Sequence, residues 1–283
     1  MKFTTKIIWY CMAPGFFISC KKDSTNNTPP ATAQAKCAII SETTSLSGNQ
    51  KNFEYKYDNK GNLILVTVTT PLGSPLFKYE TSDQSVVASH PYGGYINSTI
   101  TKYEVSDIRS ELPARAFVSL QDGDTLRVNY YTYFFFYNSK KQLIKVGEQT
   151  DYVKGDVEYD LNIFYNEQGN VSGLQYVRTT GTAGTVNIVV TGYDDKPTPY
   201  TSIKGWPYYL INFGWDNYDP EPILTALSKN NPLNYSIGSG ADLFSRKMVY
   251  KYNSDGFPTE RQNTNKNING EYTFFQTFSY TCN

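Results

Sequence analysis

The chain has 283 residues and carries no formal net charge at pH 7, with 26 Lys and Arg against 26 Asp and Glu. Proteins that bind nucleic acid need a basic surface for the phosphates, so this balance argues against nucleic acid as a partner. Tyr (25) and Phe (16) are abundant, and aromatic residues are enriched in β-strands. The composition therefore predicts a β-rich protein that does not act on nucleic acid.

Residues 1–19 have the features of a secretory signal peptide. Two lysines precede an apolar run at 7–18 that is too short to span a bilayer. Ser19 followed by Cys20 resembles the lipobox of bacterial lipoproteins, in which the cysteine is acylated and becomes the first residue; Phe17 stands where Leu is usual. We therefore expect Cys20 to anchor the protein to a membrane through lipid. Ordinary signal cleavage is the alternative.

The segment after the signal, residues 20–35, should be a flexible tether. Beyond Cys20 it contains only small, polar, proline and charged residues, which cannot bury apolar area. Its first charged residues, Lys21, Lys22 and Asp23, resemble those that follow the lipid cysteine in surface lipoproteins of Bacteroidota. We expect an outer-membrane lipoprotein, on the periplasmic face or at the cell surface.

Residues 36–283 read as one all-β domain. Apolar and polar side chains alternate with period two at 53–57, 157–165, 248–252 and 272–282. The pattern predicts about a dozen antiparallel strands in a hairpin meander with aromatic faces turned inward. We expect this sheet to curl into a barrel-like or sandwich-like domain.

A recurring motif marks the predicted hairpins. It reads YDNKGNL, YNSKKQL, YNEQGNV and YNSDGFP, and begins at Tyr57, Tyr137, Tyr165 and Tyr252. The Asp or Asn after the tyrosine can accept hydrogen bonds from the backbone that follows it and start a turn. A glycine four residues after the tyrosine supplies the positive φ that such a hairpin needs. Lys141 replaces it in the second copy, so that turn should be strained or differently shaped.

These motifs carry a resemblance to known proteins. The turn unit is similar to the tyrosine–aspartate (YD) repeats of large bacterial shell proteins. A closer resemblance is to an uncharacterised group of Bacteroidota outer-membrane lipoproteins. It covers residues 16–282 and rests on the lipobox, the hairpins, a YD-x-K-P-x-P-[FY] stretch at 193–200, an N-N-P-x-N loop at 230–234 and the flanking cysteines. The resemblance implies a domain of unknown function and transfers no catalytic residue.

Two cysteines remain once Cys11 leaves with the signal peptide and Cys20 takes the lipid. Cys37 and Cys282 lie near the two ends of the predicted domain. In an oxidising envelope compartment we expect them to form a disulfide; two buried free cysteines are the alternative. A disulfide would require the first and last strands to be neighbours or to share one edge.

The region at about 194–243 departs from the hairpin pattern and should form an irregular insertion across one end of the sheet, with a short helix at 222–229. Its aromatic faces could stack on a sugar or another flat ligand while Asn and Asp bond the hydroxyls. The alternative is that these side chains cap the sheet. The predicted ligand-binding residues are Trp206, Tyr208, Tyr209, Trp215, Asp216 and Tyr218.

Other chemistry has little support in the sequence. The acidic residues Asp216, Asp219 and Glu221 lack the spacing of a calcium loop, so we expect no metal site and no cofactor. His90 is the only histidine and precedes a proline in a glycine-rich turn, which favours a surface position. We assign no catalytic residue.

We therefore predict a non-enzymatic cell-envelope lipoprotein that binds a ligand, a glycan or an envelope partner. A structural or assembly lipoprotein without a small-molecule site is the alternative. An enzyme acting on polysaccharide comes third, since two carboxylates need only meet in space to hydrolyse a glycosidic bond.

Overall fold

The structure is a computed structural model that describes residues 37–46, 49–72, 75–89, 98–106, 111–122, 125–150, 159–178, 184–203, 220–238 and 243–282. Every described residue belongs to one compact unit, 35–283. The predicted signal peptide, tether and lipidated Cys20 lie outside the described residues. So do His90 and the six predicted ligand-binding residues.

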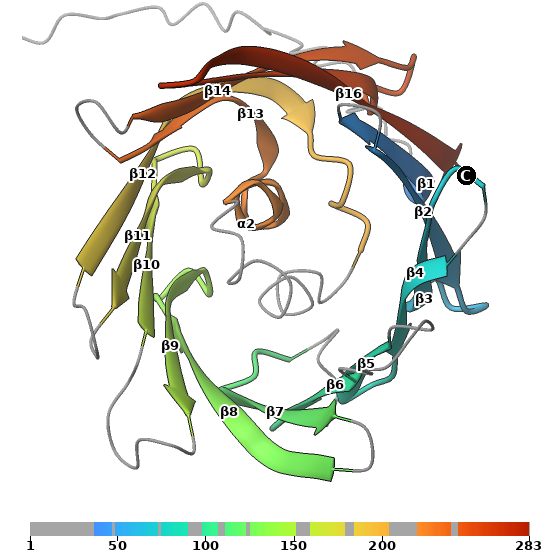
Figure 1. Cartoon of the computed structure of the whole chain (residues 1–283), viewed down its shortest axis with the longest axis vertical. Helices are drawn as coiled ribbons and strands as arrows, with labels where there is room; N and C mark the ends of the chain where they lie inside the picture. The colour runs from blue at the N-terminus through green and yellow to red at the C-terminus, as the bar shows by residue number, and fades with distance from the viewer. Residues whose placement is uncertain are drawn as a thin grey trace, which may run out of the picture. The chain divides into compact units, whose positions relative to one another are not determined.

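Within the described residues, sixteen antiparallel strands form one closed barrel, shown as a ring in Figure 1. Each strand pairs with its neighbours in the chain, and β1 pairs with β16 to close the ring. The strands are β1 (Cys37–Leu46), β2 (Asn49–Tyr57), β3 (Leu63–Thr69), β4 (Pro75–Thr81), β5 (Ser85–Ser89), β6 (Ser98–Tyr103), β7 (Arg115–Asp122), β8 (Thr125–Tyr137), β9 (Leu143–Thr150), β10 (Tyr159–Tyr165), β11 (Val171–Arg178), β12 (Gly184–Pro197), β13 (Asn230–Ile237), β14 (Phe244–Tyr252), β15 (Pro258–Asn267) and β16 (Gly270–Cys282).

The all-β class and the hairpin meander are confirmed, and the meander closes as a barrel rather than a sandwich. More strands form than the dozen expected. Strands such as β5 (SVVAS) and β6 (STITKY) are short and poor in aromatic residues, so their alternation is weak in the sequence. One helix lies among the described residues, α2 (Glu221–Leu227). It is too short to cross a bilayer, and the described part of the chain holds no helix that could.

The two faces of the barrel wall differ in polarity. On β2 and β3 the inward side chains include Tyr55, Val66 and Val68, all at most 5% exposed. Outward side chains on the same sheet include Glu54 and Lys56, which are exposed. The buried inward residues of most strands form one apolar cluster. The predicted inward orientation of the aromatic faces is therefore confirmed where the structure describes them.

The hairpin turns have the predicted geometry. In the first turn Asp58 Oδ1 accepts hydrogen bonds from the backbone N–H groups of Lys60 (2.9 Å) and Asn62 (2.8 Å). The glycines Gly61, Gly169 and Gly256 have φ values of +76°, +86° and +83°. Lys141 takes the same role with φ +62°, and its turn has the same backbone hydrogen bonds. That turn is thus strained, but its shape is unchanged.

The tyrosine that precedes each turn has a structural role that the sequence did not reveal. In three of the four motif turns its hydroxyl donates a hydrogen bond to a backbone carbonyl at or just before the start of the preceding strand: Tyr57 to Ile39 (2.8 Å), Tyr137 to Pro113 (3.0 Å) and Tyr165 to Leu143 (2.9 Å). In the fourth, Tyr252 donates to the Asp194 carboxylate. Tyr193 of β12 and Tyr280 near the end of β16 make the same kind of bond, to Val171 (2.6 Å) and Pro258 (2.8 Å). Tyrosine suits the position better than phenylalanine because its ring packs on the core while its hydroxyl satisfies the carbonyl.

The predicted disulfide between Cys37 and Cys282 is present. The two residues are direct partners in the β1–β16 pairing, with their Cα atoms 4.0 Å apart. Because even-numbered strands end where odd-numbered strands begin, the disulfide shares one end of the barrel with the four motif turns. We call this end the disulfide pole. The disulfide therefore fastens the seam that closes the barrel.

Candidate functional site

The described part of the 194–243 region comprises the end of β12, α2 and β13. Strand β12 ends and β13 begins at the disulfide pole, so residues 198–229 leave and re-enter the wall there. The predicted ligand-binding residues lie within this segment and outside the described residues, and their role stays a prediction. The candidate site that the structure describes is the attachment of this segment, which we call the insertion, to the barrel and its lumen.

The insertion occupies the place of a hairpin turn. Asp194, which follows Tyr193, accepts a hydrogen bond from the Lys196 N–H (2.9 Å), as in the other turns. Asn231 then donates its backbone N–H to Asp194 Oδ1 (3.1 Å) and its side-chain N–H to Asp194 Oδ2 (3.1 Å). In the first turn Asn62 makes the same two bonds to Asp58, at 2.8 and 2.9 Å. The stretches at 193–200 and 230–234 are therefore two halves of one interrupted turn.

The neighbouring hairpin fixes the return of the insertion. Asn170 is 3% exposed and accepts hydrogen bonds at Oδ1 from the N–H groups of Lys229 (2.9 Å) and Asn230 (3.0 Å). Its amide N–H donates to Asn230 Oδ1 (3.1 Å). Ser228 Oγ accepts the Val171 N–H (3.1 Å). Buried and fully bonded amides of this kind hold a segment in one position.

Helix α2 lies inside the ring of strands (Figure 1). Pro222 sits in its first turn, where the missing N–H costs nothing. Ile223 and Leu224 are 6% and 0% exposed and belong to the apolar cluster of the lumen. The predicted helix at 222–229 is thus present, shifted by one or two residues. It fills part of the lumen instead of lying across its end.

Glu221 fixes α2 to the wall through two buried ion pairs, with Arg246 of β14 and Arg261 of β15. Arg261 is 1% exposed. Arg246 lies over the rings of Tyr235 (5.4 Å) and Phe274 (5.3 Å). Burial alone raises the pKa of the Glu221 carboxyl, but the charges of Arg261 and Arg246 outweigh burial and hold this pKa below its ordinary value. The carboxylate is therefore charged at neutral pH.

A second buried acid holds the start of the insertion. Glu42 of β1 accepts hydrogen bonds from the hydroxyls of Tyr200 (2.7 Å) and Tyr55 (3.2 Å) and from Gln276 Nε2 (2.9 Å). Burial raises the pKa of the Glu42 carboxyl, and the hydrogen bond from Tyr200 opposes that rise. Gln276 also accepts from Arg261 Nε (2.8 Å), which links the two acids. We call the set the lumen network: Glu42, Tyr200, Glu221, Arg246, Arg261 and Gln276.

The inward face of β15 carries polar atoms that have no hydrogen-bond partner among the described residues. Within the described part of the chain, Arg261 Nη1, Asn263 Oδ1 and Asn265 Nδ2 have no hydrogen-bond partner. All three side chains are at most 1% exposed and point into the lumen. Unpaired buried polar atoms are costly, and two donors and one acceptor in a row can bond water or the hydroxyls of a ligand.

Sequence reasoning missed the lumen network, although one signal was present. In FSRKMVYKY the charged Arg246 falls in phase with Phe244, Met248 and Tyr250, on the face predicted to be buried. A charge on an apolar face requires a buried partner. The partner could not be identified, because Glu221 belongs to a different element.

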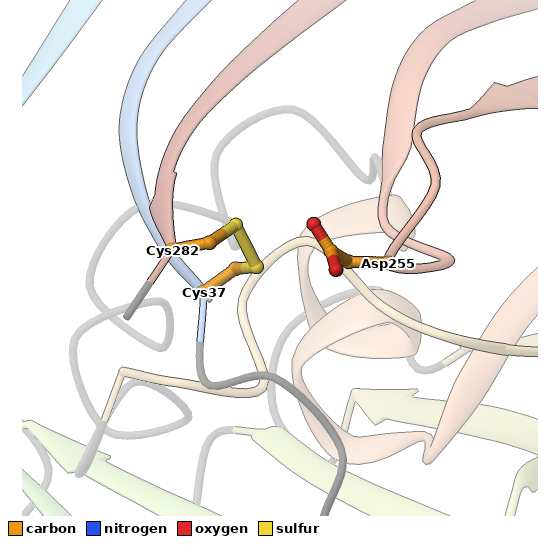
Figure 2. Close-up of side chains that lie close together, drawn as sticks. All are labelled: Cys37, Asp255 and Cys282. Atoms are coloured by element: carbon orange, nitrogen blue, oxygen red, sulfur yellow. A yellow bond between two sulfur atoms is a disulfide. The ribbon is translucent and has the colours of Figure 1, made fainter. Parts of the chain in front are cut away.

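One cluster at the disulfide pole has the residue types of a metal site. Figure 2 shows the Asp255 carboxylate beside the Cys37–Cys282 disulfide, and the ligand-type atoms of the three residues lie within 4.8 Å of one another. Thiolates bind metal ions, whereas these two sulfur atoms are bonded to each other. In this state Cys37 and Cys282 form a covalent cross-link beside the Asp255 carboxylate, and their sulfur atoms are not thiolate ligands.

Comparisons with known proteins identify the fold only. No family model and no curated protein matches the chain. The structure is similar to the crystal structure of a porin-like protein from Bacteroides uniformis, with TM-score 0.55 and 15% identity over 86% of this chain and 96% of that one. A porin-like protein from Bacteroides vulgatus matches with TM-score 0.48 and 11% identity, covering 86% of this chain and 99% of that chain.

At this identity the first neighbour shows a shared barrel fold and no shared activity. Its source is in line with the predicted resemblance to a Bacteroidota group of unknown function. That membership and the likeness to YD repeats stay predictions.

Proposed function

We propose that the protein is a non-enzymatic cell-envelope lipoprotein whose plugged barrel presents the insertion to a glycan, another ligand or an envelope partner. The observation that carries this proposal is the attachment of both ends of the insertion. Tyr200 is bonded to Glu42, Glu221 is paired with two arginines, and Asn170 and Asp194 hold the return. Fixing both ends of a segment to the wall lowers the conformational entropy that binding has to remove.

The polarity of the wall supports a barrel that stands in water. Membrane barrels turn an apolar band outward and keep a polar interior. Here the outward positions of β14 and β15 include Lys247, Lys251, Glu260 and Lys266, with Lys251 and Glu260 paired at 2.7 Å. The interior is predominantly apolar. The lipid on Cys20, and not the wall, is then the membrane anchor.

The helix inside the lumen supports binding over passage of solutes. Helix α2 packs against the apolar cluster, and its acid is buried between two arginines. Opening a channel would expose this apolar surface and separate a buried ion pair, which typically costs several kcal/mol.

Tryptophan fluorescence tests the proposed platform. After removal of the signal peptide the only tryptophans are Trp206 and Trp215, both in the insertion. We expect the emission of the mature protein to shift on titration with at least one member of a panel of soluble oligosaccharides or cell-wall fragments. The variants Trp206→Phe and Trp215→Phe assign the signal. Unchanged emission across the panel, with both tryptophans shielded from acrylamide, contradicts the platform.

Metabolic labelling with a fatty-acid analogue tests the anchor. The wild-type chain should incorporate the label, and Cys20→Ser should not. Label retained in Cys20→Ser would contradict lipidation at this residue.

A further inference from the structure

A groove of about 570 Å³ lies near the disulfide pole. It lies where the β10–β11 turn meets β11, β12 and the start of β13. Its lining combines amide and hydroxyl side chains and two carboxylates with the apolar surface of Val190 and Tyr193, and Asp195 pairs with Lys196 (3.5 Å). Residues of this kind bond the hydroxyls of neutral ligands, whereas a phosphate or sulfate would meet like charge. The lining includes Asn166, Gln168, Ser172, Thr191, Asp195 and Asn230.

An exposed aromatic ring lies at the edge of this groove. Phe164 of β10 faces outward, 51% exposed, and its cross-strand partner Gly173 is next in sequence to the groove residue Ser172. Gly173 pairs in turn with Val189, which is 50% exposed. The three residues form one outward row across β10, β11 and β12.

Glycine in the centre of this row leaves the ring of Phe164 without a covering side chain. A Cβ at Gly173 would lie 3.0 Å from the Ile188 carbonyl oxygen and 3.9 Å from Phe164 Cδ2. The first distance excludes a larger residue without movement of the backbone. The row is therefore an apolar strip in which Gly173 is buried beside the ring of Phe164 and the ring itself is half exposed to solvent.

The next row away from the pole is an amide ladder. Asn162 Nδ2 donates to Gln175 Oε1 (3.2 Å), and Gln175 Nε2 donates to Asn187 Oδ1 (3.1 Å). Each amide has further donor or acceptor positions that point away from the sheet. The apolar strip thus lies between a row of hydrogen-bonded amides and the groove.

We propose that this outer surface of β10–β12 binds a neutral oligosaccharide, with the face of one pyranose ring stacked on Phe164. A pyranose has an apolar face and a rim of hydroxyls, and the surface offers an aromatic face with polar groups on both sides. The proposal shares its ligand class with the proposed function but not its site. The insertion and this surface can therefore be tested separately.

Isothermal titration calorimetry on the mature lipidated protein in detergent tests the site with soluble gluco-, xylo-, manno-, galacto- and chito-oligosaccharides. Phe164→Ala should weaken binding of the bound sugar by about tenfold or more, as expected at a central contact. Phe275→Ala is the matched control, because Phe275 is an outward phenylalanine of similar exposure (46%) on β16. It should change the affinity less than twofold. Circular dichroism checks that both variants fold.

Three outcomes separate this site from the insertion. Binding that Phe164→Ala abolishes while tryptophan emission stays constant supports the outer site and contradicts the insertion as the platform. Binding that survives Phe164→Ala and Gln175→Ala but is lost in Trp206→Ala or Trp215→Ala overturns the outer site and leaves the proposed function standing. Absence of heat with every sugar class overturns the outer site.

Discussion

Lys141 occupies the position that glycine occupies in the three other motif turns, and its backbone is strained there. Its φ of +62° is in the left-handed region, which disfavours a residue with a Cβ by about 1–2 kcal/mol. Asn138 still receives the N–H groups of Lys140 (2.9 Å) and Gln142 (3.0 Å). The side-chain bonds of the turn therefore impose the conformation on the lysine.

Lys141→Gly should raise the free energy of unfolding by about 0.5–1 kcal/mol, since the glycine relieves strain but gains entropy in the unfolded chain. Urea denaturation at pH 7 measures the change. Gly61→Ala is the converse control: a Cβ there meets nothing within 4 Å, so only its φ of +76° opposes the change. That variant should lose a similar amount. Equal stability of both variants and the wild type would contradict the strain.

At the scale of single residues, the sequence predicted the hydrogen bonds between residues that are close together in the chain. The acceptor of the turn and its donors lie within four residues, so the motif identifies them. The tyrosine hydroxyls were not assigned, because Tyr165 reaches a carbonyl 22 residues away. Glu42 was missed for the same reason: its partners Tyr200 and Gln276 lie 158 and 234 residues along the chain.

Glu221, in the first turn of α2, holds the helix in the lumen through its two buried ion pairs. Glu221→Gln removes the charge that Arg246 and Arg261 share and should lower the free energy of unfolding at pH 7 by about 3–5 kcal/mol. Chemical denaturation measures it. Glu260→Gln, at the exposed pair with Lys251, is the control and should change stability by less than about 1 kcal/mol.

The pH dependence of this difference has a definite sign. The folded pKa of Glu221 lies below its ordinary value of 4.5, so the stabilisation is complete above that pH and is lost as the pH falls through the folded pKa. Wild type and Glu221→Gln should therefore converge in stability below about pH 4.5. Glu42 has a raised pKa and the opposite sign, and the charge of Glu221 adds to that rise, so the two proteins are compared with Glu42→Gln in both. A difference that stays constant down to pH 3 would refute the assignment.

The elements were predicted best where alternation is strong. The stretches at 157–165 and 248–252 contain β10 and the end of β14. The turn motif at Tyr193 was visible, but its second half lies beyond the insertion at Asn231. Residues that a long segment separates leave no short-range pattern in the sequence. The sequence therefore showed that the region departs from the hairpin pattern, but not how its ends are attached to the barrel.

The whole barrel presents charge to its surroundings, which determines how the protein should behave without a membrane. With Cys20→Ser in the secreted chain, we expect a monodisperse protein in detergent-free buffer, because the outer wall carries exposed Lys and Glu side chains. Size-exclusion chromatography with light scattering measures this. Aggregation that only detergent reverses would indicate an apolar, lipid-facing wall.

The number of strands and the choice of a barrel over a sandwich could not be predicted from the sequence. Both depend on register and tilt across the complete sheet, which no single segment encodes.

The Cys37–Cys282 disulfide should contribute about 5 kcal/mol to stability, because it joins residues 245 positions apart and removes much of the freedom of the unfolded chain. The double variant Cys37→Ser/Cys282→Ser, compared with the wild type by urea denaturation, measures this contribution. Reduced wild-type protein is the control and should match the variant. A loss below about 1 kcal/mol would contradict the estimate.

The order of the strands also bears on how the barrel is made. Fifteen of the sixteen wall pairings join consecutive strands, and all of these but β12–β13, which residues 198–229 separate, can form from a hairpin with a short connection. The β1–β16 pairing alone must bring together segments from opposite ends of the domain, at the largest loop-closure cost. A nascent chain therefore holds its first strand as an unpaired edge until the last strand has been synthesised. Cys37 and Cys282 are partners in this last pairing, so their disulfide marks a barrel whose strands have all paired.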